Sequence, residues 1–141
     1  MAASITLEVA TPERPLLKEQ VKEVELPGLN GALGVLPEHA PLLTELGAGE
    51  LSYVVEGAGR KYMSVSGGWA EVLPDHVRVL AIRAELSSEI DIQRAQEALK
   101  RAEDRLFNPK ADLDAARALN AMKRAQARLL CAQHAGISPR K

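Results

Sequence analysis

Six arginines in the last third of the chain are spaced so that they could bind phosphate groups. Residues at i, i+7 and i+11 lie on one face of an α-helix, and this spacing occurs twice: Arg94, Arg101 and Arg105, then Arg117, Arg124 and Arg128. A guanidinium group can donate two parallel hydrogen bonds to a phosphate. If the two rows belong to helices that fold against each other, Arg94 comes near Arg124 and Arg128, and together they could hold a triphosphate.

The same arginines have other interpretations, which the residues alone leave open. The rows could be an ordinary solvated charged face, with nearby acids serving as helix caps. They could also bind an acidic protein surface, because residues 87–141 hold eleven Lys and Arg against seven Asp and Glu, with no acid beyond Asp114. Long-range attraction would then favour docking to an anionic partner.

The first part of the chain, residues 1–86, has the pattern of β-strands. Short apolar bursts with alternating residues, such as Ile5, Leu7 and Val9, are separated by turn residues at intervals typical of an antiparallel sandwich. Gly57 to Gly59, Gly67-Gly68 and Pro74-Asp75 are expected to be tight connections between strands. We therefore predict an antiparallel β-sandwich of about ten short strands.

The second part, residues 87–141, has the pattern of an antiparallel two-helix hairpin, which makes the whole chain α+β. Ser88 and Asp91 resemble a capping box at the start of the first helix. Asn108-Pro109 should end that helix, because proline disfavours the α conformation of the residue before it. The second helix is expected to start between Pro109 and Asp112.

The apolar seams of the two predicted helices are narrow and rich in alanine. The first seam is Ile92, Ala95, Leu99, Ala102 and Leu106, and the second is Ala111, Ala115, Ala118, Met122, Ala125, Leu129 and Ala132. Alanine side chains let helices approach closely but bury little apolar area, so they stabilise the contact weakly. The hairpin is predicted to open easily.

Several classes of function are disfavoured by composition. Aromatic residues make up 3% of the 141 residues, so a base-stacking surface for nucleic acid is not expected. The three histidines and Cys131 lack metal-ligand spacing, and no nucleophile motif or phosphate loop stands out, so neither a metal site nor catalysis is predicted. No apolar run is long enough for a membrane span and the N-terminus has no export signal, so we expect a cytosolic bacterial chain without direct lipid insertion.

Two glycine-containing motifs carry a family resemblance. The run from Gly31 to Leu46 reads GALGVLPEHAPLLTEL, and the run from Gly67 to Val72 reads GGWAEV. Their sequence and spacing resemble the epsilon subunit of rotary F-type ATP synthases, and the resemblance extends over nearly the whole chain. Glu38 departs from the glycine that many relatives have at this position.

The resemblance implies which loops meet the rest of that complex. Gly28, Leu29, Asn30, Gly31 and Ala32 correspond to a loop that faces the membrane-embedded c-ring. His39 and Pro41 fall in the adjoining segment, near the ring and the gamma shaft.

The resemblance also implies a nucleotide site. Ile90, Asp91, Arg94 and Ala95 match the Ile/Leu-Asp-x-x-Arg-Ala motif that binds ATP in some bacterial epsilon subunits, and Glu85 precedes it at the family's spacing. With the arginine rows, the expected ATP-binding residues are Glu85, Ile90, Asp91, Arg94, Ala95, Arg101, Arg124 and Arg128.

As a family member, the chain would be a non-catalytic subunit of the proton-translocating synthase, peripheral at the cytoplasmic face of the plasma membrane. The sandwich domain would join gamma to the c-ring in the rotor, and the hairpin domain could meet the beta and alpha subunits and restrain ATP hydrolysis. No cofactor is required, and ATP would act as a regulator by favouring a folded over an extended hairpin. The alternative hypothesis is a stand-alone adaptor or chaperone whose hairpin grips client proteins.

Overall fold

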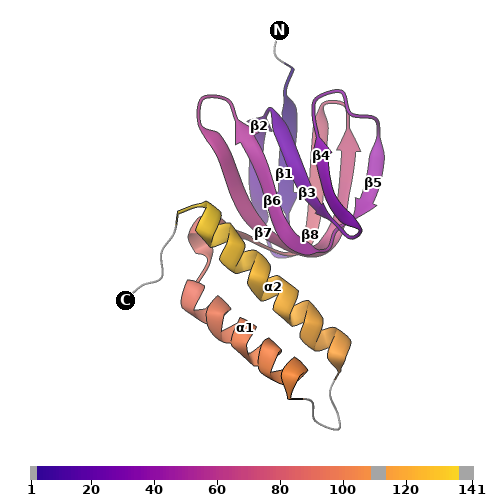
Figure 1. Ribbon diagram of the computed structural model, residues 1–141. Helices are drawn as coiled ribbons and strands as arrows, with labels where there is room; N and C mark the ends of the chain where they lie inside the picture. Colours follow the sequence, from indigo (N-terminus) through magenta and orange to yellow (C-terminus); the bar gives the residue numbers. More distant parts are fainter. Residues whose placement is uncertain (1–2, 109–113, 137–141) are drawn as a thin grey trace.

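The computed structural model describes residues 3–108 and 114–136, which form a block of strands followed by two helices (Figure 1). The elements in chain order are β1 (Ile5–Ala10), β2 (Pro15–Val21), β3 (Glu23–Gly28), β4 (Gly31–Val35), β5 (Leu42–Glu45), β6 (Ala48–Val55), β7 (Gly59–Leu73), β8 (His76–Leu86), the 3-10 turn η1 (Ser87–Glu89), α1 (Ile92–Phe107) and α2 (Ala115–His134). The predicted α+β class is confirmed.

The strands form a β-sandwich whose hydrogen-bonded order is β2-β1-β8-β7-β6-β3-β4, with β5 paired to β7. Among the described strands, every pairing is antiparallel except β1 with β8, which is parallel. The core between the layers consists of aliphatic residues with little aromatic content, and its largest fully buried side chains include Ile5, Leu7, Leu26, Leu51 and Met63.

Strand β7 belongs to both layers because it bends at Gly67-Gly68. Its first half pairs with β6 as far as Ser66, and its second half pairs with β5 from Trp69 onward. Both glycines have positive φ, and a Cβ on Gly68 would overlap the carbonyl oxygen of Leu80. The prediction that Gly67-Gly68 is a tight turn between two strands was wrong, because the pair forms a bend inside β7. Since the expected turn lies within one strand, the described residues form eight strands instead of about ten.

The helix starts differ in detail from those predicted. Asp91, rather than Ser88, is the N-cap of α1, and its carboxylate accepts a hydrogen bond from the backbone N–H of Arg94 at 3.0 Å. Ser88 lies in the 3-10 turn η1. Helix α2 begins at Ala115 with Asp114 as its N-cap, later than predicted, while the expected start and Ala111 of its seam lie outside the described residues.

Helix α2 lies between the sandwich and α1, as Figure 1 shows. One face of α2 packs on α1, and another packs on β6 and β7. A second, small cluster of buried residues ties the end of α2 to the start of α1: Ile90, Ile92, Cys131 and Ala132, with Tyr62 and Leu129 against them. Neither described helix is both long and apolar enough to cross a membrane.

Gly68→Ala should destabilise the fold, because the added methyl group meets backbone atoms of β8 and the backbone φ of +112° disfavours a side chain. We expect the free energy of unfolding, measured by urea denaturation, to fall by at least about 2 kcal/mol. Gly34→Ala is the matched control, because a Cβ there meets nothing within 4 Å, and it should change stability by less than about 0.5 kcal/mol. Equal effects of the two variants would contradict the bend in β7.

Candidate functional site

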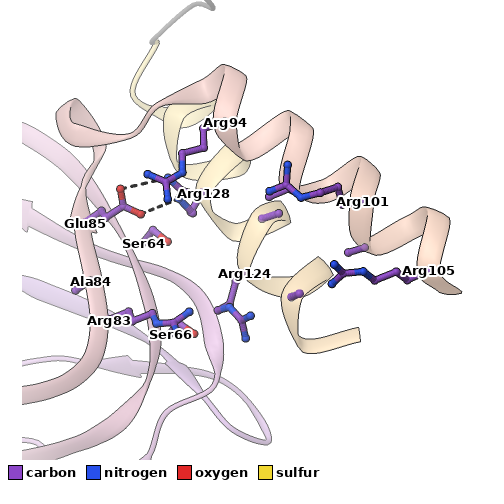
Figure 2. Close-up of a pocket in the computed structure, with 14 residues that line it drawn as sticks. Ser64, Ser66, Arg83, Ala84, Glu85, Arg94, Arg101, Arg105, Arg124 and Arg128 are labelled. Atoms are coloured by element: carbon purple, nitrogen blue, oxygen red, sulfur yellow. Dashed lines mark hydrogen bonds and ion pairs between the residues drawn. The ribbon is translucent and has the colours of Figure 1, made fainter. Parts of the chain in front are cut away.

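An open pocket of about 310 Å³ lies where α1, α2 and the β7–β8 pair meet (Figure 2). The pocket combines long cationic side chains with serines and alanines. Its lining residues are Ser64, Ser66, Arg83, Ala84, Glu85, Arg94, Ala98, Arg101, Ala102, Arg105, Ala121, Arg124, Ala125 and Arg128. Three separate parts of the chain therefore contribute to one site.

The strand side of the pocket is set by the register of β7 and β8. Arg83 is paired with Ser66, and Glu85 is paired with Ser64. Directly opposed residues and residues two apart along a strand share a face of a sheet. These four side chains therefore form one polar group on the sheet face that α2 covers in part.

Glu85 and Arg128 form an ion pair that joins the sandwich to α2. Arg128 Nε lies 2.7 Å from Oε1 of Glu85, and Nη2 donates a hydrogen bond to Oε2 at 3.4 Å (Figure 2). The Nε–H group is buried but is not aligned for a hydrogen bond, so its contact with the carboxylate is electrostatic. Both side chains are partly buried, so solvent and salt screen the attraction between them less than they would screen an ion pair on the open surface.

Positive charge in the pocket exceeds negative charge. Six arginines line it with one carboxylate, that of Glu85. Burial, followed by the like charges of Arg83 and Arg117, lowers the pKa of Arg124. Among the described residues no carboxylate pairs with Arg83, Arg94, Arg101, Arg105 or Arg124. The site is chemically suited to an anion with several charges.

The structure brings together five of the eight residues predicted for nucleotide binding: Glu85, Arg94, Arg101, Arg124 and Arg128. The other three do not line the pocket. Asp91 caps α1, Ile90 is buried in the small cluster and Ala95 is fully buried, so they fix the first turn that carries Arg94.

Sequence reasoning missed Arg83 as a pocket residue. It stands two positions before Glu85, and the observed strand β8 carries both residues, so strand alternation puts the two side chains on the same face. Arg105 was in the predicted basic row and does line the pocket, whereas Arg117 is not among the lining residues.

The loops expected to face neighbouring subunits lie at opposite ends of β4. Leu29 and Asn30 form the two-residue turn between β3 and β4, where Gly28 pairs with Gly31 and Leu29 is exposed. His39 and Pro41 follow the other end of β4, before β5. A five-residue strand is about 16 Å long, so the structure does not bring the two groups together.

Glu38, beside His39, has a positive φ of 70°. Its backbone N–H donates to the carbonyl of Pro74 at 2.7 Å, which holds this conformation in place. A left-handed backbone favours glycine. This explains physically why glycine suits the position and shows that glutamate is accommodated with the turn intact.

An apolar face, which we call the Trp69 face, lies on the outside of β5, β7 and β8. Its apolar residues are Leu43, Trp69, Leu80 and Ile82, which are 66%, 50%, 59% and 65% exposed, and the charged residues Glu71 and Arg78 lie on the same face. Trp69 is directly opposite Leu80 in the β7–β8 register. Scattered exposed apolar residues are ordinary, whereas a contiguous group on one sheet face indicates an interaction surface.

Comparison with known families matches both parts of the chain. The family model "ATP synthase, Delta/Epsilon chain, beta-sandwich domain" matches residues 4–87, and "ATP synthase, Delta/Epsilon chain, long alpha-helix domain" matches residues 88–133. The chain belongs to the ATP synthase delta/epsilon chain family. The resemblance given by the glycine motifs is thereby confirmed.

Individual relatives agree with this family. An ATP synthase epsilon chain of Solibacter usitatus is 57% identical over 109 residues, which cover 77% of this chain and 81% of the relative. An ATP synthase epsilon chain of Koribacter versatilis is 51% identical over 106 residues, which cover 75% of this chain and 74% of the relative.

Solved structures show the same fold. A chain of the Euglena gracilis mitochondrial ATP synthase matches with a TM-score of 0.77 at 24% identity, covering 95% of this chain and 81% of that one. A chain from the Tetrahymena thermophila mitochondrial ATP synthase central stalk and c-ring structure matches with a TM-score of 0.54 at 16% identity, covering 96% of both chains.

The docked hairpin should protect Cys131 from alkylation. Burial, followed by the charges of Glu50 and Glu85, raises the pKa of this thiol to about 12, and the thiolate is the reactive form. Iodoacetamide at pH 8, followed by mass spectrometry, should modify the native chain at least about 100-fold more slowly than the urea-unfolded chain.

The control for this measurement is Gln133→Cys in a Cys131→Ser background, because residue 133 is exposed on the same helix turn. Its cysteine should react at nearly the same rate in the native and unfolded chains. If native Cys131 reacted as fast as this control, α2 would not be docked in solution.

Proposed function

We propose that this chain is the epsilon subunit of a rotary F-type ATP synthase, a non-catalytic part of the central stalk on the cytoplasmic side of the plasma membrane. The observation that carries the proposal is the family match to both the sandwich and the helices, residues 4–133. The adaptor hypothesis loses its basis, because relatives about half identical to this chain are named ATP synthase epsilon chains.

In this proposal the sandwich joins the gamma subunit to the c-ring through two separate surfaces. The Trp69 face carries four large exposed apolar residues, which suits a lasting contact with gamma. The turn at Leu29 is flanked by Gly28 and Gly31 and followed by Ala32. Because this turn is narrow, it suits the polar loops of the ring. His39 and Pro41 lie beyond the far end of β4 from this turn, so we assign them to gamma rather than to the ring.

A charge on the Trp69 face should weaken binding to gamma. Trp69→Glu places a carboxylate on a surface that becomes buried, which is costly without a partner. When tagged gamma is purified, the amount of this chain recovered with it should be at least about tenfold lower for the variant than for the unmodified chain. Leu29→Glu is the control and should leave recovery unchanged, since that residue lies on the ring-facing turn. Normal recovery of the Trp69 variant would contradict the proposed surface.

The hairpin, in this proposal, is a regulatory element with a folded and an extended state. The structure has the folded arrangement, in which α2 packs on β6 and β7. In the extended state the arginines of both helices would be free to bind acidic surfaces of the beta and alpha subunits and restrain ATP hydrolysis. The same guanidinium groups cannot line the pocket and bind those acidic surfaces at the same time, so the two states would be mutually exclusive.

ATP would favour the folded state by binding in the arginine-lined pocket. Arg94 of α1 and Arg124 and Arg128 of α2 line it together with Glu85 of the sandwich. A polyphosphate there contacts elements that separate when the hairpin opens. A ligand shifts such an equilibrium by the ratio of its affinities for the two states.

Titration calorimetry of the isolated chain tests this regulation. ATP should release heat with a 1:1 stoichiometry, and Arg94→Ala should weaken the affinity at least about tenfold, because a charge-assisted hydrogen bond is lost. Lys123→Ala removes an equal charge from an exposed position outside the pocket and should leave the affinity nearly unchanged. Absence of heat with the unmodified chain would remove nucleotide sensing from the proposal.

A further inference from the structure

We infer that the docked hairpin has a proton-sensitive contact, in which His134 at the end of α2 holds Glu50 of β6 more strongly when its imidazole ring is protonated. This inference rests on the folded and extended states proposed above and adds the proton as an input to them. Neither residue lines the arginine-rich pocket. The inference is carried by the geometry of the contact and by the burial of its carboxylate.

The contact joins the last residue of α2 to the sandwich. Nδ1 of His134 lies 2.8 Å from both carboxylate oxygens of Glu50. The imidazole ring also lies against Tyr62 of β7, with the two ring centres 4.9 Å apart. One turn earlier on α2, Cys131 is fully buried in the small cluster that includes Tyr62 at its edge. The contact therefore forms only while the end of α2 is docked on β6 and β7.

Glu50 depends on His134 for its positive charge. The side chain of Glu50 is 14% exposed and that of His134 is 41% exposed. Among the described residues, no other basic group lies within ion-pair distance of Glu50. A carboxylate that loses hydration without gaining an opposite charge costs free energy. Docking imposes this cost when the imidazole ring is neutral, and protonation of the ring offsets it.

The sign of the pH effect follows from which groups are present in each state. Histidine is the side chain that ordinarily changes charge between about pH 5 and 8. The C-terminal end of a helix favours a positive charge, but α2 has this end in both states. Glu50 faces the ring only in the docked state. Docking is therefore strongest at low pH and weakens as the pH rises and the imidazolium is lost.

Other charged groups surround the contact without sharing its titration. On the neighbouring elements they are Arg60 and Tyr62 of β7, Glu85 of β8, Glu89 of η1, and Arg128 and Cys131 of α2. The three arginine and glutamate pairs Arg60–Glu23, Arg128–Glu85 and Arg14–Glu89 are already formed. Carboxyl, guanidinium and phenol groups ordinarily ionise outside the range from about pH 6 to 8, and burial raises the pKa of Cys131 to about 12.

The protection of Cys131 measures docking at each pH. The rate of modification by dithiodipyridine is measured for the native chain and divided into the rate for the urea-unfolded chain at the same pH, which removes the ionisation of the free thiol. This protection should be at least about twofold higher at pH 6 than at pH 8. A smaller difference with a protected Cys131 would overturn the inference and leave the folded state intact. Absence of protection at both pH values would instead contradict the folded state itself, and the inference with it.

His134→Gln and Glu50→Gln assign the effect to the two residues. Each variant removes one partner of the charge pair, so its protection should be nearly equal at pH 6 and pH 8. The matched control is His76→Gln, because His76 also lies beside a carboxylate, that of Glu8 at 3.3 Å, but on the β1–β8 pair. This control should keep the full pH dependence, and circular dichroism should show an intact fold for all three variants. A twofold pH dependence that persists in either test variant, or is lost in the control, would overturn the assignment.

Discussion

The docking of α2 on β6 and β7 is the contact on which the rest of the structure depends. It uses small side chains, with Ala127, Cys131 and Ala132 buried on α2. Helix α1 packs on α2 and, through Ile92, on the small cluster at its own start. The position of every arginine on the hairpin relative to the sandwich therefore follows from this one contact.

Docking also brings like charges close together, and their repulsion opposes docking. Three arginines of α1, two of α2 and one of β8 line the same pocket, and the ion pair between Arg128 and Glu85 offsets only part of their repulsion. The apolar contact that opposes this repulsion is modest, because small side chains bury little area. A weak apolar contact combined with an excess of positive charge fits the proposal that anions favour the docked hairpin. In the proposed extended state, the same arginines would be free to bind acidic protein surfaces.

Much of the fold could be predicted from local patterns. Apolar alternation and turn residues indicated the sandwich, and the change to helical periodicity at Ser87 indicated the hairpin. Predictions failed where tertiary packing changes the meaning of a local signal. Gly67-Gly68 has the composition of a turn, yet it allows β7 to bend between β6 and β5. Ser88 and Asp91 have the spacing of a capping box, yet the turn η1 places Asp91 itself at the N-cap.

The sequence by itself determined the family, the two-part architecture and the helical rows of arginines, because motif spacing and periodicity are properties of neighbouring residues. Only the tertiary structure decided that Arg83 joins these rows, that Glu85 is held by Arg128, and that Ile90 and Ala95 support the site from behind. It also decided that the turn at Leu29 and the segment at His39 lie apart. Such relations depend on how strands pair and where a helix docks, and those contacts join residues that are distant along the chain.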